Sequence, residues 1–275
     1  MNMNNDEYLR KLLSEKANGS FLSQEDLHKF AEVSGWFTLF CRHYELNYNI
    51  YMHTKVSMIG ARANGTSLKG KSDMDILATV TGYSSMEQPT TKELFSYLLY
   101  FLKRHIGGIR INEQLLSYRI DFDGYIVHLT PSIQLEKSSY KKKWVRYYDQ
   151  TIYSRRTDSI ITTNFHKHID LVRNSGLQEE IMCVKLWRDC HNLELPSMYI
   201  YALAIEVITE KNKSGLFDNV SRIISYLTGP FPKAVFDPSN PENELPSQHS
   251  LDGCLALTSA AQSFSNNTPL SELIW

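Results

Sequence analysis

The sequence predicts an α+β fold in which a mixed half, made of strands and helices, precedes a helical half. Two short strand patterns frame a glycine-rich segment between residues 56 and 77, and an alternating pattern flanks Asp123-Gly124. From residue 163 onward the patterns are those of amphipathic helices. We therefore expect two domains, over residues 1–160 and 161–275.

The composition is that of an ordinary globular protein. The chain has 275 residues, of which 42% are hydrophobic and 21% charged, and its formal net charge is −1. This length suits one large domain or two small ones. A net charge near zero neither favours nor excludes nucleic acid as a partner.

Helices are expected on both sides of the first strand pair. Ser23 is a good N-cap, and apolar residues recur at helical spacing from Leu27 to Tyr44. Residues 56–59 and 73–77 read as strands, with a glycine-punctuated loop between them. After a loop over 81–90, a helix is expected over 91–103, ended by Gly107-Gly108.

The hairpin prediction depends on Asp123-Gly124, which favours a type I′ turn. Residues 117–122 and 125–131 alternate on its two sides. We expect Pro131 to end the second strand, because proline cannot donate a hydrogen bond to a sheet.

Residues 73–77 place two acids on one side of a strand. Since side chains alternate across a strand, Asp73 and Asp75 share a face while Met74 and Ile76 face the core. Two carboxylates this close repel each other unless a cation lies between them. Mg²⁺ favours one or two carboxylates together with phosphate oxygens, and glycine turns offer backbone N–H groups to phosphate. The stretch suits a metal-bound triphosphate.

This stretch resembles the signature of the DNA polymerase β-type nucleotidyltransferase superfamily. The signature reads Gly-Ser, Gly-Thr, Leu, Gly and Ser-Asp-x-Asp, and here the matching residues are Gly60-Ala61, Gly65-Thr66, Leu68, Gly70 and Ser72-Asp73-Met74-Asp75. The sequence is most similar to the branch of archaeal CCA-adding enzymes, oligoadenylate synthases and bacterial cyclic-oligonucleotide synthases. The resemblance implies that Asp73 and Asp75 are catalytic and hold two ions, Mg²⁺ or Mn²⁺. It further implies a nucleotide-binding set of Gly60, Ala61, Gly65, Thr66 and Ser72.

The helical half carries a second resemblance. Helices are expected over 179–192, from 197, and over 216–228, with a proline-rich loop at 237–241. Lys185-Leu186-Trp187-Arg188, Leu195-Pro196-Ser197 and Asp237-Pro238 are similar to the helical domain of poly(A) polymerases and oligoadenylate synthases. The resemblance implies that Lys185 and Ser197 contact the triphosphate, with the active site in the cleft between the two domains. The alternative for Lys185 is a solvated surface lysine.

Alanine replaces the serine of the first signature pair, at Gly60-Ala61. In the family this hydroxyl helps to hold the β and γ phosphates. Losing a hydrogen bond to a charged group costs about 1.5–3 kcal/mol, so we expect weaker triphosphate binding.

His128, in YIVHLTPSI, stands where the family has its third catalytic carboxylate. A neutral imidazole can ligate a transition metal such as Mn²⁺, or act as a general base near pH 7. The alternative is that the site has lost catalysis. In the predicted hairpin, Asp121 pairs opposite Ile126 and shares a face with His128, about 7–8 Å away by the diagonal spacing. We do not expect Asp121 to be a direct substitute.

Basic and aromatic residues are interleaved over 137–173. This pattern suits phosphate neutralisation and base stacking, as in binding of single-stranded nucleic acid. The alternative is a solvated face whose aromatic residues pack into the core.

The four cysteines show no C-x-x-C spacing, which indicates reduced thiols. No apolar run approaches the roughly 18 residues of a membrane helix, and the first residues do not read as a signal peptide. We expect a cytoplasmic protein without membrane association.

The leading hypothesis is an enzyme, a metal-dependent nucleotidyltransferase that uses an NTP or dNTP. A hydroxyl attacks the α-phosphate and pyrophosphate leaves. By analogy with small prokaryotic members, the product is an oligonucleotide or cyclic nucleotide signal in antiviral defence, read by a downstream effector protein. A protein side chain or a small molecule as acceptor stays open. The alternative, favoured by Ala61 and His128, is a catalytically impaired pseudo-enzyme that binds nucleotide or nucleic acid as a sensor or regulator.

Overall fold

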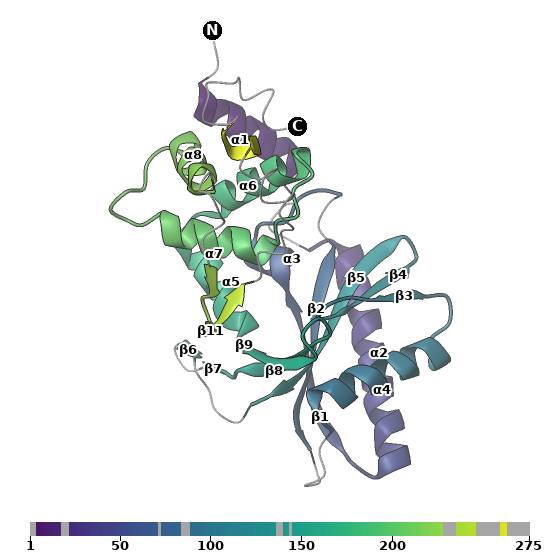
Figure 1. The fold of residues 1–275 in the computed structure, drawn as a ribbon. Helices are drawn as coiled ribbons and strands as arrows, with labels where there is room; N and C mark the ends of the chain where they lie inside the picture. The colour runs from purple at the N-terminus through teal and green to yellow at the C-terminus, as the bar shows by residue number, and fades with distance from the viewer. Residues whose placement is uncertain are drawn as a thin grey trace. The chain divides into compact units, whose positions relative to one another are not determined.

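The computed structural model describes residues 4–17, 22–70, 73–83, 89–135, 140–142, 145–227, 235–245 and 259–262 (Figure 1). The chain divides into two compact units. The sheet unit comprises the described residues of 19–64 and 71–169, and the helical unit those of 1–18, 65–70 and 170–275. These ranges differ from the predicted domains, because the N-terminal helix and the second part of the glycine-rich segment belong to the helical unit.

Among the described residues, the sheet unit contains a mixed sheet of seven strands. Its main path runs in the order β1 (Met52–Ile59), β2 (Met74–Tyr83), β5 (Tyr125–Gln134), β4 (Tyr118–Phe122) and β3 (Arg110–Glu113). The end of β5 also pairs with β8 (Gln150–Ser154), which pairs with β9 (Ser159–Thr163). The β2–β5 pair is parallel and the other pairs of this sheet are antiparallel. A separate two-stranded ladder joins β6 (Tyr140–Lys142) to β7 (Val145–Tyr147).

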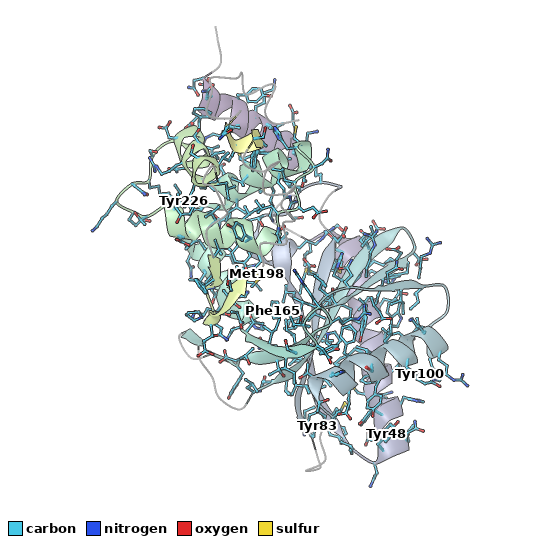
Figure 2. All side chains as sticks on the ribbon, viewed as in Figure 1. Tyr48, Tyr83, Tyr100, Phe165, Met198 and Tyr226 are labelled. Atoms are coloured by element: carbon cyan, nitrogen blue, oxygen red, sulfur yellow. The ribbon has the colours of Figure 1, made fainter. Side chains whose placement is uncertain are left out.

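Helices α2 (Gln24–Tyr48) and α4 (Thr91–His105) cover one face of this sheet (Figure 1). Met74 and Ile76 of β2 are fully buried in the core beneath them, with Val127 and Leu129 of β5. The alternation predicted for residues 73–77 is therefore confirmed, and the acids of this stretch lie on the opposite face. The outer side of the helix layer is exposed at Tyr48 and Tyr100 (Figure 2).

Both of these helices begin at a capping box, and for α2 the cap at Ser23 is the predicted one. The Ser23 hydroxyl accepts the Asp26 N–H and the Asp26 carboxylate accepts the Ser23 N–H, each at 3.0 Å. Thr90 and Glu93 make the same reciprocal capping box at the start of α4. Because each box satisfies two backbone donors of the first turn, it fixes the residue at which the helix starts.

The predicted hairpin is present, with its type I′ turn. Asp123 and Gly124 have φ values of 46° and 75°, the double positive φ that this turn requires, and Asp121 pairs opposite Ile126 as expected. The prediction that Pro131 ends the second strand is wrong, since β5 continues to Gln134. Along β5, pairing with β4 extends to Leu129 and pairing with β8 starts at Ile133, so the missing N–H of Pro131 falls between two partner strands on that side.

Three further differences concern element type. The start of the glycine-rich segment, predicted to be a loop, forms the short helix α3 (Gly60–Asn64). The predicted loop over 81–90 starts later, because β2 continues to Tyr83. The proline-rich loop at 237–241 is instead part of a hairpin of β10 (Val235–Asp237) and β11 (Asn240–Leu245). There a register shift between Phe236 and Asp237 leaves Pro241 without an opposite residue, so the proline is tolerated.

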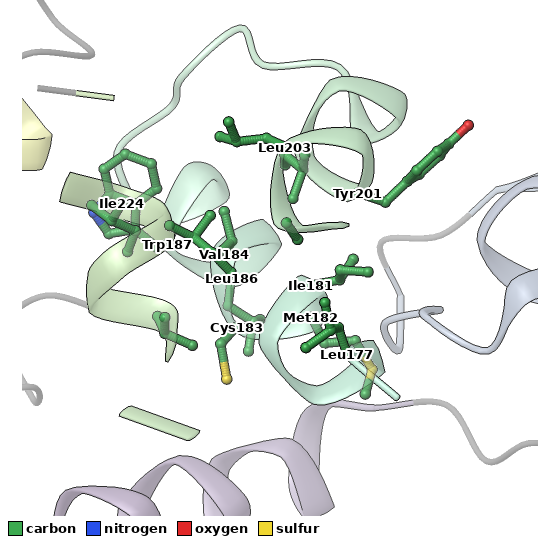
Figure 3. Close-up of a cluster of buried hydrophobic side chains, with 14 of the residues drawn as sticks. Leu177, Ile181, Met182, Cys183, Val184, Leu186, Trp187, Tyr201, Leu203 and Ile224 are labelled. Carbon is green, nitrogen blue, oxygen red and sulfur yellow. The ribbon is translucent and has the colours of Figure 1, made fainter. Parts of the chain in front are cut away.

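The helical unit surrounds a second hydrophobic core. Its helices are α1 (Asn5–Lys16), the end of α5 (Phe165–Ser175), α6 (Gln178–Cys190), α7 (Ser197–Val207) and α8 (Leu216–Tyr226). Trp187 of α6 is fully buried near Ile224 of α8 and Leu203 of α7 (Figure 3). The unpredicted α1 buries Leu9, Leu12 and Leu13 in the same core. In the described part of the chain, no helix combines the length and the apolar character needed to cross a membrane.

Candidate functional site

The turn at Gly60 lies directly against the Asp75 carboxylate. β1 ends at Ile59, opposite Asp75, and the chain enters α3 through Gly60 with a φ of 68°. A Cβ atom on Gly60 would lie 2.0 Å from Asp75 Oδ2. Glycine is therefore required twice here, for its positive φ and for the space that the carboxylate occupies.

His128 lies beside both acids on the polar face of the sheet. The parallel register pairs His128 with Asp75, and His128 Nε2 lies 2.8 Å from Asp73 Oδ2. The side chains of Asp73 and His128 are 35% and 19% exposed, so the pair is accessible from solvent. The structure thus brings together the three residues predicted to be catalytic, within one unit.

The two carboxylates suit a divalent ion that arrives with phosphate. Within the described ranges, no group of three or more His, Cys, Asp and Glu side chains is arranged to hold a metal ion. One hard ion, however, takes one or two carboxylates and completes its octahedron with phosphate oxygens and water. Asp73 and Asp75 offer the two carboxylates. His128, where the family has a third carboxylate, offers an imidazole instead.

Lys185 is buried, so its interpretation as a solvated surface lysine is wrong. Only 3% of the residue is exposed. Its Nζ donates to the hydroxyl of Thr66 at 2.8 Å and to the Thr66 carbonyl at 3.2 Å. Within the helical unit, α6 is thereby tied to the second part of the glycine-rich segment, where Gly65 has a φ of 82°.

Ser197 is exposed at the first position of α7. Its hydroxyl accepts a hydrogen bond from Arg188 Nη1 at 3.2 Å, and the same nitrogen donates to the Leu195 carbonyl at 3.0 Å. Arg188 also pairs with Asp189 at 2.7 Å. The predicted residue Ser72 lies outside the described residues.

No protein-family model matches the sequence, and neither does any curated protein. The structure, in contrast, is similar to solved bacterial enzymes. The CD-NTase CdnG of Bradyrhizobium diazoefficiens, solved with GTP, has a TM-score of 0.65 and 12% identity, covering 95% of this chain and 90% of its own. CdnC of E. coli MS115-1, solved with ATP, has a TM-score of 0.64 and 16% identity, covering 96% and 93%. The Vibrio cholerae cyclic AMP-GMP synthase DncV has a TM-score of 0.60 and 13% identity, covering 95% and 90%.

The chain has the CD-NTase fold. CD-NTases belong to the polymerase β-type nucleotidyltransferase superfamily, so the predicted α+β architecture is confirmed. The likeness extends over nearly the whole chain and therefore includes both units.

Two arginines of the sheet unit that form ion pairs were not singled out from the sequence. Arg119 is the antiparallel partner of His128, and its Nε donates to Asp121 Oδ1 at 3.1 Å. The Asp121 carboxylate is thus held by a guanidinium. Arg62 of α3 pairs with Asp26 at 2.7 Å. The sequence signal for Arg119 is its place in the hairpin register, opposite His128.

Only part of the basic and aromatic segment over 137–173 is among the residues that the structure describes. Lys137, Lys143 and Trp144 are outside the described residues. Arg155 pairs with Glu113 of β3 at 3.3 Å. Binding of single-stranded nucleic acid here stays a prediction.

Proposed function

We propose that this chain is a nucleotidyltransferase that uses Mg²⁺ or Mn²⁺ to join NTPs or dNTPs into an oligonucleotide or cyclic nucleotide signal. The observation that carries the proposal is the pair Asp73 and Asp75 on one sheet face, against the Gly60 turn, in a CD-NTase fold. Adjacent carboxylates repel each other and destabilise a fold that has no use for them. Their retention is explained by a cationic ligand.

In this proposal each residue has a role that follows from its position. Asp73 and Asp75 would hold the divalent ions, which would offset the negative charge on the triphosphate oxygens, including those on the reacting phosphorus. Backbone N–H groups at Gly60 and Ala61 orient the phosphates. His128 accepts the proton of the acceptor hydroxyl as its oxygen attacks the α-phosphorus, the bond to the bridging oxygen breaks and pyrophosphate leaves.

The helical unit supplies further phosphate ligands. Lys185 brings a positive charge to Thr66, and Ser197 offers a hydroxyl at the start of α7. Together with Gly65 and Ser72, these residues complete the proposed nucleotide-binding set. Binding a phosphate costs little further desolvation or ordering of Lys185, because its ammonium is already buried and held in place.

The direct test is incubation with each NTP and dNTP, in Mg²⁺ and in Mn²⁺, with products identified by mass spectrometry. We expect a product longer than the substrate, together with pyrophosphate, in at least one mixture. Asp73→Asn and Asp75→Asn keep the size of the acids but remove the charge, so both variants should lose the product by more than about 100-fold. Product formation that survives both changes would refute the assigned roles.

A second candidate function is favoured by Ala61 and by the contact between His128 and Asp73. These features fit a pseudo-enzyme that binds nucleotide without turnover and acts as a sensor or regulator. Calorimetry separates the two candidates: nucleotide binding without any product supports the pseudo-enzyme. In that case His128→Asp, which restores the family's carboxylate, should produce measurable turnover.

We place this reaction in prokaryotic antiviral defence, in the cytoplasm, with an effector protein that recognises the product. CdnC of E. coli MS115-1 has been solved in complex with HORMA-deltaN, which supports an additional protein partner. The test is phage challenge of a host that expresses the chain with its genomic neighbours. Protection by the wild type that is lost with Asp73→Asn is the expected result.

A further inference from the structure

The Asp26 side chain makes contacts well beyond its own helix. Asp26 is 5% exposed and lies in the first turn of α2. Its Oδ2 accepts the Ser23 N–H, which completes the capping box. Its Oδ1 lies 2.7 Å from Arg62 Nη1 of α3 and 3.5 Å from the Tyr125 hydroxyl of β5. A helix cap needs one carboxylate oxygen, so the second oxygen has a different use.

Arg62 belongs to a helix that is too short to be stable alone. α3 spans five residues, Gly60–Asn64, and isolated helices of this length do not persist in water. Its position must come from tertiary contacts. The ion pair from Arg62 to Asp26 is largely buried, with side-chain exposures of 17% and 7%. Charge-assisted hydrogen bonds of this kind are shorter and stronger than those between neutral groups.

The first residue of α3 is the glycine that touches Asp75. With 2.0 Å between a Cβ built on Gly60 and Asp75 Oδ2, there is little room for the turn to move toward the carboxylate. A shift of α3 therefore changes the surroundings of Asp75 and the direction of the backbone N–H groups at Gly60 and Ala61. A continuous series of contacts joins Asp26, Arg62, Gly60 and Asp75.

We propose that Asp26 is a positioning residue for the nucleotide site: through Arg62, it holds α3 so that the Gly60 turn and Asp75 together receive the triphosphate. This inference rests on the proposed function for its ligand. According to this proposal, the first turn of α2 contributes to the affinity for triphosphate, although it carries none of the motif residues.

The same helix provides a matched control. Lys29, about one turn after Asp26, is 7% exposed and pairs with Asp123 at 2.7 Å. Its ammonium also lies 4.7 Å from the centre of the Phe122 ring. This ion pair joins α2 to the hairpin turn rather than to α3. The Lys29 side chain is 8% exposed and that of Asp123 is 72% exposed. Breaking this pair therefore tests the cost of losing the ion pair of a buried charged residue at this end of α2.

The experiment compares Asp26→Asn and Arg62→Gln with Lys29→Met in the full chain. Asparagine has a single acceptor oxygen, so it can keep the cap or bind Arg62 but not both. Three quantities are measured: thermal stability, affinity for a non-hydrolysable ATP analogue with Mn²⁺ by calorimetry, and hydrogen exchange of the peptide containing residues 60–64. Arg62→Lys, which keeps the charge, serves as the conservative variant.

We expect Asp26→Asn and Arg62→Gln each to weaken analogue binding by about tenfold and to accelerate exchange over 60–64, with the double variant no worse than either single one. Arg62→Lys should recover part of the affinity. Lys29→Met should lower thermal stability by a similar amount while its affinity stays within about twofold.

Equal affinity in Asp26→Asn and wild type, or an equal loss in Lys29→Met, would overturn the proposal. If the wild type binds no nucleotide with any metal, the proposed function fails, whereas hydrogen exchange over 60–64 still decides whether Asp26 fixes α3. If Asp26→Asn does not fold, Arg62→Gln gives the same comparison without changing the cap.

Discussion

Gly60 shows how one missing side chain shapes the candidate site. A substitution at Gly60 would be destabilising for two separate reasons: the φ of 68°, and the distance of 2.0 Å between an added Cβ and Asp75 Oδ2. A left-handed backbone costs a non-glycine residue about 1–2 kcal/mol, and the overlap with the carboxylate adds to this. Gly70 has a φ of 66° but nothing within 4 Å of the added atom, so it isolates the first penalty.

We therefore predict that Gly60→Ala destabilises the protein by more than about 2 kcal/mol, and Gly70→Ala by about 1–2 kcal/mol. Urea denaturation at pH 7 measures both values. Equal losses in the two variants would show that the contact with Asp75 relaxes at no cost.

Lys185 is the residue for which burial most changes the expected effect of a substitution. Lys185→Met keeps the length of the side chain but removes both hydrogen bonds to Thr66. We predict a loss of about 1–3 kcal/mol in the free energy of unfolding. The exposed Lys103, changed to Met, should stay within about 0.5 kcal/mol of the wild type. An equally small effect at both lysines in urea denaturation would contradict the structure.

At the residue scale, the acids of the site could be predicted from the sequence, whereas their partners could not. Strand alternation alone places Asp73 and Asp75 on one face. The contact between Asp73 and His128, in contrast, joins residues 55 positions apart in the sequence and depends on the register between two parallel strands. The contact between Arg62 and Asp26 likewise joins segments whose proximity no local pattern encodes.

At the scale of elements, the capping box of α4 has a consequence for pH dependence. Hydrogen bonds from the Thr90 N–H and hydroxyl lower the pKa of Glu93 from its usual value of 4.5. A carboxyl whose pKa is lower in the folded state stabilises the fold above its unfolded pKa, and this contribution is lost as pH falls through the folded pKa.

We predict that the wild type loses more stability than Glu93→Gln when pH falls from 6 to below 4.5. Thr90→Ala should lower stability at both ends of this range, by about 1 kcal/mol, because the helix loses its cap. Denaturation midpoints in urea, measured across the range, are the readout. Parallel pH profiles for wild type and Glu93→Gln would contradict the prediction.

Elements with strong local signals were predicted, and those fixed by their neighbours were not. Ser23 and the Asp123-Gly124 turn carry their own chemistry, so α2 and the β4–β5 hairpin follow directly. Pro131 looks like a strand end, but it lies where β5 changes partners from β4 to β8. α3 and the β10–β11 hairpin are short segments without a distinctive period, and their conformations depend on tertiary contacts.

At the scale of the whole molecule, the reactivity of two buried thiols can be used to follow the opening of each hydrophobic core. Cys41 lies in the core of the sheet unit and Cys183 in that of the helical unit. Burial raises the pKa of Cys41 to about 12 and raises that of Cys183 as well. Cys190 is only partly buried. Because the thiolate is the reactive form, burial and a raised pKa both slow alkylation.

We predict that iodoacetamide at pH 8 labels Cys190 first, and that Cys41 and Cys183 react only when urea opens their own cores. The rates are measured by mass spectrometry of peptides, in a Cys254→Ser background because Cys254 lies outside the described residues. Rapid labelling of Cys41 in the native protein would mean that the core of the sheet unit is more open than the structure shows.

The alternation along β2 also limits how relatives of this chain can diverge. Met74 can be exchanged for another apolar residue, since it only fills the core. A codon gained or lost between Asp73 and Asp75, however, would turn one acid into the core and expose an apolar side chain in its place. Related genes should therefore show substitutions at Met74 but keep the spacing between the two aspartates unchanged. A gap at this place in an alignment would indicate a lineage that has lost the catalytic activity.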